Sequence, residues 1–247
     1  VKWATWTSTL GWPVQGIWSG NQDGSDINTL DRSRSGHLLA TGDDDGKVKL
    51  FRYPCVDAGS ESVDYSGHSS HVMNVRWTAG DEFLVSVGGG DNTIFHWKHR
   101  MQEAAGSANS SSDPFFDESA TLVGQSKNDP IAIPSAGDEF LAVKPWLGAI
   151  RTPDRPPPVQ ATAPSESLQL DWCFGYTSAT TGTANTLVSS NLFFNSEGEA
   201  VYPAASLGVV LSKGGTHAQA QRHFRAHTND VLCLAVSKDR RFVATGT

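Results

Sequence analysis

Cysteine is scarce in this chain, and the few cysteines are poorly placed for disulfides or for metal binding. Only three occur, Cys55, Cys173 and Cys233, and no two of them have the Cys-x-x-Cys spacing of a metal or redox site. Because the number is odd, a disulfide framework is disfavoured. We therefore expect a reducing, intracellular compartment.

Long apolar runs and an excess of positive charge are also missing. No apolar stretch approaches the roughly 18 residues of a membrane span, and the opening Val1-Lys2-Trp3 is not a signal peptide. Lysine and arginine total 19 against 26 aspartates and glutamates, so the formal net charge is −7. An acidic chain without a local basic patch is a poor candidate for binding nucleic acid or an anionic membrane. Four arginines stand among neutral residues and are expected to be solvated surface: Arg222, Arg225, Arg240 and Arg241.

A short apolar phrase that ends in glycine occurs three times, at Leu38–Gly42, Phe83–Gly88 and Phe242–Gly246. Gly42 and Gly88 lie 46 residues apart, close to the period of roughly 40–45 residues that is typical of β-propeller blades. The 24 glycines, 12 prolines and 8 tryptophans suit an all-β protein with many turns. The repeats therefore predict an all-β fold of propeller blades, each a four-stranded sheet.

Composition divides the chain into four parts. Residues 1–100 contain short strands between turn signals, 101–141 form a low-complexity, irregular insertion, 142–166 form a proline-rich linker, and strands resume in 167–247. In the last part we expect strands at Leu168–Trp172, Thr186–Phe194, Ala200–Leu211 and Val231–Val236. The third copy of the phrase stops at Thr247, before its turn, so we expect a truncated blade and further blades beyond both ends.

The second repeat carries a constellation of polar side chains that resembles the WD-repeat pattern. His68 precedes a strand, Asp91 opens a turn, and Trp97 lies six residues after that aspartate on the next strand. In that pattern a loop histidine, a strand hydroxyl, a turn aspartate and a strand tryptophan share hydrogen bonds. A buried imidazole and a buried carboxylate each need a partner, so we expect His68, Asp91 and Trp97 to form a structural blade network.

The other repeats supply parts of the same pattern. The first has Thr41 and, six residues before Phe51, Asp45. Phe51 lacks the indole donor, and the position four before the aspartate of the second repeat is Val87, which has no hydroxyl. Both networks are therefore expected to be incomplete. The third repeat contributes His227 and Thr245.

No motif argues for catalysis, a cofactor or a metal. A His-Ser-Asp catalytic interpretation of the constellation lacks a nucleophile elbow, and its repetition favours a scaffold role. On a strand, His68 and His71 would face opposite sides, which disfavours a shared metal ion. The Gly88–Asp91 run lacks the Lys-Ser/Thr and helix of a phosphate loop. Pro153-x-x-Pro156 fits either a proline-helix ligand for an SH3-type groove or a stiff spacer.

The stretch Leu168–Tyr176 resembles the hydrophobic (HELP) motif of the echinoderm microtubule-associated protein-like (EML) family. The residues that carry the resemblance are Trp172, Phe174, Gly175 and Tyr176. Glu199–Ala205, Gln221–His227 and the opening Trp3–Trp6 are similar to that family as well. The resemblance implies WD40-type propellers, with the end of one propeller followed by the start of the next. That order is similar to the long family members with repeated tandem-propeller units, in which the motif helps build the joint between propellers.

The resemblance also implies a function: a non-enzymatic scaffold that associates with tubulin or microtubules. It would act in the cytoplasm on the cytoskeleton, and with other axonemal proteins in a ciliary axoneme. The net charge of −7 weighs against simple electrostatic binding to the acidic microtubule exterior, so we expect contact through shaped propeller faces. Two alternatives stay open. One is a general WD40 scaffold without tubulin binding, and the other is an enzyme that uses the central funnel of the propeller.

Overall fold

The computed structural model describes residues 5–18, 26–101, 121–122, 149–177, 191–214 and 220–247. Within these ranges every strand pairing is antiparallel. One short 3₁₀ helix, η1 (Trp12–Ile17), interrupts a region where only strands were expected, and Pro13 near its start suits that geometry. Among the described residues, no helix is long and apolar enough to cross a membrane. The fold is all-β, as the repeats predicted.

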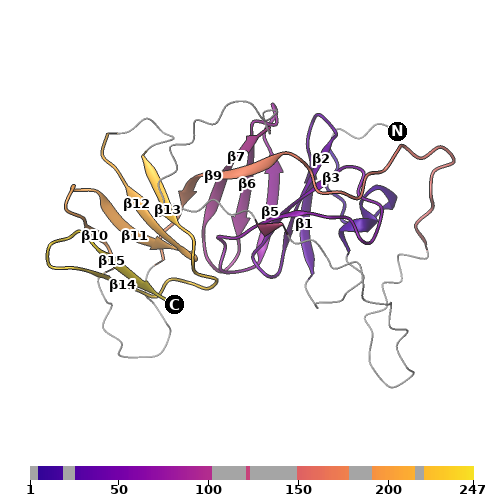
Figure 1. Ribbon diagram of the computed structural model, residues 1–247. Helices are drawn as coiled ribbons and strands as arrows, with labels where there is room; N and C mark the ends of the chain where they lie inside the picture. Colours follow the sequence, from indigo (N-terminus) through magenta and orange to yellow (C-terminus); the bar gives the residue numbers. More distant parts are fainter. Residues whose placement is uncertain (1–4, 19–25, 102–120, 123–148, 178–190, 215–219) are drawn as a thin grey trace, which may run out of the picture.

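Three sheets of four or five strands lie side by side across the molecule (Figure 1). The first contains β1 (Ile27–Arg32), β2 (Leu38–Asp43), β3 (Val48–Arg52), β4 (Val63–Tyr65) and β8 (Thr121–Leu122). The second contains β5 (Val72–Trp77), β6 (Phe83–Gly88), β7 (Ile94–Arg100) and β9 (Ser167–Phe174). The third contains β10 (Phe193–Phe194), β11 (Ala200–Ala204), β12 (Leu207–Leu211) and β13 (Gln221–Phe224). A fourth, two-stranded sheet pairs β14 (Cys233–Val236) with β15 (Val243–Gly246).

The outer strand of the second sheet comes from beyond the linker. β9 pairs with β7 from Ile94↔Phe174 to Arg100↔Ser167, with one bulge next to His96. The division of the sequence at 142–166 therefore separates two strands that the structure joins in one sheet. Residues 151–166 form no strand, which agrees with the run of prolines. Their end is fastened to the first sheet, because Glu61 N donates to Ala161 O at 2.7 Å and Arg52 Nε donates to Ala163 O at 3.1 Å.

Burial follows the two-residue period of the strands. β6 alternates between half-buried and buried side chains, so it covers the core with one face only. β2 is buried at every position because both faces of the first sheet are covered. One face joins the main core, which all three large sheets share, and the other packs on η1. The main core includes Leu38, Leu50, Leu84, Phe95, Trp97, Leu170, Leu207 and Val209. The smaller core includes Val14, Ile17, Leu30, Leu39 and Phe51.

Side chains of β1 pair with the backbone of the neighbouring inner strand, β5. Thr29 Oγ1 accepts from Val75 N at 3.4 Å, and Asp31 Oδ2 accepts from Trp77 N at 2.9 Å. Burial raises the pKa of the Asp31 carboxyl, although the Trp77 amide acts in the opposite direction. These bonds satisfy edge amides that have no strand partner, and they fix the first two sheets against each other.

The same turn precedes each copy of the repeated phrase. A hydroxyl accepts the amide five residues later at 3.0–3.1 Å, and the residue three positions after that hydroxyl has a positive φ. The pairs are Ser33 with Leu38, Thr78 with Phe83, and Ser237 with Phe242, and the positive-φ residues are Gly36, Asp81 and Arg240. This shared local chemistry shows that the three phrases are the same element of three blades.

Some expected strands differ in extent. Ala200–Leu211 is a hairpin of two strands, because the chain reverses through Ala205 at a φ of +51°. The strand expected to begin at Val231 begins at Cys233. Only Phe193–Phe194 is a strand within the described part of Thr186–Phe194, and residues 186–190 lie outside the described ranges.

Candidate functional site

The polar network of the second sheet is assembled around His68. Its Nδ1 lies 2.8 Å from Asp91 Oδ2, and its Nε2 lies 2.8 Å from Ser86 Oγ. Trp97 Nε1 donates to the same Ser86 oxygen at 2.8 Å. The four side chains come from the β4–β5 loop, β6, the β6–β7 turn and β7, so the network ties the loop and the turn to the two central strands.

The partners of His68 fix its tautomer. A carboxylate only accepts, so Nδ1 carries the proton toward Asp91, and Nε2 accepts the hydroxyl proton of Ser86. The Ser86 oxygen then receives the indole N–H, and every group is satisfied. Burial alone would raise the pKa of Asp91, but the hydrogen bonds from His68 and from the amide of Thr93 outweigh it and lower that pKa.

The expectation of an incomplete network in this blade is wrong. Counting back from Asp91 pointed to Val87, whereas the structure uses Ser86. Six residues separate the paired positions Val87 and Ile94, against five between Gly42 and Val48 in the first sheet. The longer turn places Asp91 five residues after the strand hydroxyl of Ser86. The count of four residues used in the sequence analysis therefore pointed to the wrong position.

The first sheet lacks this network. Thr41 Oγ1 is buried and has no hydrogen-bond partner among the described residues, and Phe51 offers no donor. Asp45 was expected in the network, but it is exposed, and Asp43 is buried instead. Asp43 Oδ1 accepts from the amides of Asp45 and Lys47 at 3.1 and 2.8 Å. Asp43, the first residue of the turn, therefore holds the turn with its own side chain, and Asp45 lies at the exposed tip.

The third repeat brings two expected residues together. His227 Nε2 lies 2.7 Å from Thr245 Oγ1, and the ring of Phe224 packs edge-on against the imidazole. Both polar side chains are half-buried. This contact links β15 to the segment that follows β13.

The motif strand β9 is bound along both edges. Besides its ladder with β7, the side-chain amide of Gln221 accepts from Cys173 N at 2.7 Å and donates to Cys173 O at 3.0 Å, as a neighbouring strand would. Leu168 N donates to the Tyr65 hydroxyl at 2.8 Å. The motif strand therefore contacts all three large sheets.

The aromatic residues of the motif lie at its exposed end. Trp172 is half-buried, with its ring centroid 5.9 Å from that of Phe174, which is half exposed. Gly175 has a φ of +142°, and a Cβ there would lie 2.7 Å from Thr93 Cγ2, so only glycine fits. The Tyr176 hydroxyl donates to Asn191. These residues lead the chain from the second sheet into the third.

The loop between β4 and β5 is held by the C-terminal part of the chain. Ser206 N and Oγ both donate to Gly67 O, at 3.2 and 2.8 Å, and Arg225 donates to Ser66 O at 2.8 Å. Ser69 Oγ donates to Asp230. Because this loop also carries His68, the blade network is braced from outside the blade.

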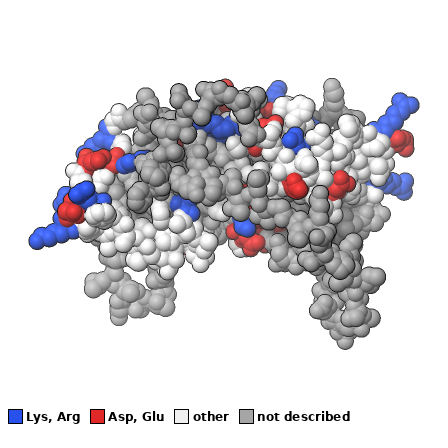
Figure 2. Space-filling model, viewed as in Figure 1, with Lys and Arg blue, Asp and Glu red and all other residues white. Residues whose placement is uncertain are grey.

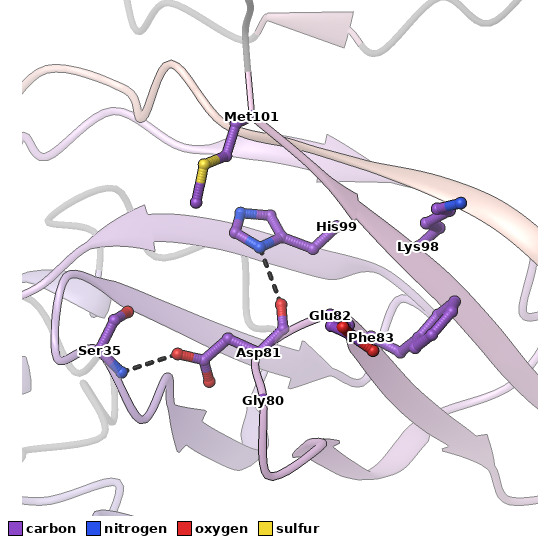
Figure 3. A pocket seen from close by; sticks show the side chains of 8 residues that line it. All are labelled: Ser35, Gly80, Asp81, Glu82, Phe83, Lys98, His99 and Met101. Atoms are coloured by element: carbon purple, nitrogen blue, oxygen red, sulfur yellow. Dashed lines mark hydrogen bonds between the residues drawn. The ribbon is translucent and has the colours of Figure 1, made fainter.

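A surface pocket of about 480 Å³ lies between the turns of the first two sheets (Figure 3). Phe83, Lys98 and Met101 line it together with His99, whose Nδ1 lies 2.9 Å from Asp81 O. Among the described residues that line this pocket, no nucleophile stands beside a base. It is a seam between two blades.

The buried cysteines and the described histidines do not form a reactive or metal-binding site. Burial raises the pKa of the Cys55 thiol to about 11 and that of Cys173 to about 12, so neither is a reactive thiolate. Within the described ranges, no three histidine, cysteine, aspartate or glutamate side chains are grouped to hold a metal ion. His71 Nδ1 pairs with Asp44 rather than joining His68.

Charged side chains are mixed on the face shown in Figure 2. Lys and Arg occur beside Asp and Glu at both ends of the molecule, and uncharged atoms cover much of the rest of the described surface. The coloured atoms of this face form no continuous basic area. The described surface on this side is therefore suited to contacts of shape and mixed polarity.

These features define a class of protein: WD40-type β-propeller blades joined by a HELP motif. Models of known families match in the same order, "Echinoderm microtubule-associated protein second beta-propeller" at residues 1–99, "HELP motif" at 163–209 and "WD domain, G-beta repeat" at 218–247. Over residues 1–99 the chain is similar to the second β-propeller of the echinoderm microtubule-associated proteins.

Individual relatives are similar to this chain over about 40% of its length. "Echinoderm microtubule-associated protein-like 3" of Mus musculus is 50% identical over 97 residues, which are 39% of this chain and 11% of that protein. "Echinoderm microtubule-associated protein-like 1" of Homo sapiens is 49% identical over 98 residues, 40% of this chain and 12% of that protein. The "77 kDa echinoderm microtubule-associated protein" of Strongylocentrotus purpuratus is 47% identical over 97 residues, 39% of this chain and 14% of that protein.

The match thus spans only 11–14% of the length of these relatives. Among solved structures, the β-propeller domain of Cps50 (Swd1) from Myceliophteria thermophila is similar with a TM-score of 0.24 and 11% identity, covering 87% of this chain and 62% of that one.

Proposed function

We propose that the chain is part of a non-enzymatic scaffold that associates with microtubules or soluble tubulin. The observation that carries this proposal is the identity of 47–50% over 97–98 residues to proteins named as microtubule-associated. A shared partner is therefore the simplest inference for the surface of the first two blades.

The geometry supports a scaffold rather than an enzyme. His68 is buried in a complete network, and both of its ring nitrogens are occupied by structural partners. The network residues Asp91 and Trp97 are equally enclosed, with 6% and 0% of their surface exposed. A substrate cannot reach these groups without unfolding the blade. The network residues stabilise the blade, and the outer surface of the blade would contact the partner.

The mode of binding follows from charge. With a net charge of −7 and mixed charges on the visible face, long-range attraction to an acidic polymer is weak. Binding would therefore depend on shape and short-range contacts, and it should change little between low and physiological salt. Finer parts of the proposal are that the chain belongs to a tandem-propeller protein, that it acts in the cytoplasm, and that it joins a ciliary axoneme.

Co-sedimentation tests the proposal. The intact protein is mixed with stabilised microtubules at two salt concentrations, and separately with soluble tubulin on a sizing column. We expect saturable pelleting or a tubulin complex that survives the higher salt. The control is the variant Gly88→Ala, which disturbs the blade that matches the relatives and should weaken binding. Absence of both pelleting and a tubulin complex defeats the proposal, and pelleting that disappears at moderate salt defeats the shape-based mode.

A general protein-binding scaffold without tubulin affinity is the second candidate. The acidic net charge favours it, because most microtubule surfaces would repel the chain. Affinity capture from ciliated cells separates the two candidates. Enrichment of tubulin with axonemal proteins supports the first, and a partner set without tubulin supports the second. The hypothesis that the protein joins the axoneme is tested by imaging a labelled protein in ciliated cells. A diffuse cytoplasmic signal would refute this hypothesis and leave the proposed tubulin binding unaffected.

A further inference from the structure

The turns of the first two blades are held together by one carboxylate. Asp81 Oδ1 accepts from Arg34 N at 2.6 Å, and its Oδ2 accepts from Ser35 N at 2.7 Å. Two successive backbone amides therefore converge on one anion, a geometry that binds carboxylates and phosphates alike. Figure 3 shows this contact between Ser35 and Asp81 at the rim of the pocket.

Asp81 is positioned for this task by its backbone. It has a φ of +56°, and its own amide donates to Thr78 O at 3.1 Å. A left-handed aspartate at the tip of the turn directs its carboxylate out of its own blade. The contact with residues 34–35 crosses from the β5–β6 turn of the second sheet to the β1–β2 turn of the first, so it reports whether the two turns are docked.

Two serines in this turn differ in access. Ser33 is 1% exposed, and its hydroxyl accepts from Leu38 N at 3.0 Å. Ser35 is exposed, and its hydroxyl lies 3.0 Å from that of Ser33. Arginine occurs three and one positions before Ser35, in the sequence Arg32-Ser33-Arg34-Ser35. Arg34 is exposed, whereas Arg32 is half-buried, with its guanidinium carbon 5.0 Å from the centre of the Tyr53 ring.

We propose that Ser35 is a phosphorylation site for a kinase that selects arginine near its target serine, and that the phosphate undocks the two turns. In the transfer, Ser35 Oγ forms a bond to the terminal phosphorus of ATP and the bond from that phosphorus to ADP breaks. The hydroxyl proton passes to a carboxylate of the kinase, so the reaction is balanced. Positively charged arginines beside the serine complement an acidic kinase groove.

The phosphate repels Asp81 directly. It carries a charge of about −1.5 to −2 on a residue whose own amide the aspartate binds. Repulsion between the two anions acts toward release of Asp81 and leaves the two amides open to water. Glu82, at the same pocket, adds to the repulsion, while Lys98 and His99 line the pocket and offset part of the charge. Loss of the carboxylate contact frees the turn of the second blade from that of the first.

The modification is tested on the whole chain. The folded protein is incubated with ATP and a kinase of this specificity, and modified residues are located by mass spectrometry. We expect labelling at Ser35 and none at Ser33, with loss of the signal in Ser35→Ala and slower labelling in Arg34→Ala. Labelling of Ser35 only after the chain is unfolded would overturn the assignment, because the turn would then be closed to a kinase.

The undocking is tested by hydrogen exchange of the Arg34 and Ser35 amides. Phosphoserine is placed at position 35 during synthesis, and exchange should rise by about 10- to 100-fold, the protection expected of a charged hydrogen bond. Asp81→Asn keeps the left-handed backbone, since asparagine tolerates it, and removes the charge. In this variant the phosphate should add no further increase. Unchanged exchange in the phosphorylated protein, or an equal increase in both backgrounds, overturns the mechanism, and neither outcome bears on microtubule binding.

Discussion

Substitution of Ser86 gives a direct measure of the blade network. Its hydroxyl is fully buried, accepts from Trp97 Nε1 at 2.8 Å and lies 2.8 Å from His68 Nε2. In Ser86→Ala an indole donor and an imidazole acceptor both lose their partner inside the core. A buried group left unpaired costs about 1–3 kcal/mol, so the free energy of unfolding should fall by about 3 kcal/mol.

The first blade provides the matched control. Thr41 is the equivalent strand hydroxyl. Gly42 and Val87 form the last strand pair before the turn in their sheets, and Thr41 and Ser86 come directly before them. Its Oγ1 has no partner among the described residues, so Thr41→Val removes nothing favourable and should change stability by less than about 0.5 kcal/mol. Urea unfolding followed by tryptophan fluorescence gives both values. Equal losses in the two variants would refute the reasoning, because packing rather than hydrogen bonding would then explain them.

Two further predictions concern the same core. In Gly88→Ala the new Cβ would lie 1.9 Å from Asp91 Oδ1, so the carboxylate must move and the free energy of unfolding should fall by about 2 kcal/mol or more. The control is Gly59→Ala, which has no neighbour within 4 Å of the new Cβ and should cost less than about 0.5 kcal/mol. Thermal melting compares the two variants. Burial, assisted by Arg225, lowers the pKa of His223 from 6.5 to about 4. The unfolded chain therefore binds the extra proton, and stability present above pH 6.5 should fall by about 3 kcal/mol as the pH drops to 4. His223→Gln should flatten that part of the profile in urea titrations, and an unchanged slope would exclude His223 as its source.

The sequence predicted the parts of the fold that depend on local pattern. The repeated apolar phrase located β2, β6 and β15, and the spacing of His68, Asp91 and Trp97 identified side chains that the structure brings together. The assignment of Asp45 to the network failed because spacing to the next strand does not say which carboxylate bonds the turn amides. Asp43 stands directly after Gly42, as an Asx-turn residue should, and that signal was available.

The pairing of β9 with β7 could not be predicted from pattern, because residues 101–166 lie between the two strands. One signal did exist: a blade has four strands, and the second repeat supplies only three before the low-complexity segment. A missing outer strand had to come from elsewhere. The first apolar strand after the linker, Leu168–Trp172, was the nearest candidate.

The double engagement of β9 affects how the chain could act on a partner. One edge of the strand is paired with β7, and Gln221 of the third sheet occupies part of the other, so the proline-rich linker does not separate freely moving modules. The brace of Ser206 on Gly67 holds the same two parts at a second point. If a partner contacts a surface that spans the second and third sheets, that surface is formed before the partner arrives, and its assembly costs no ordering entropy on binding. Such an ordered surface would favour the proposed contact through shape over attraction through charge.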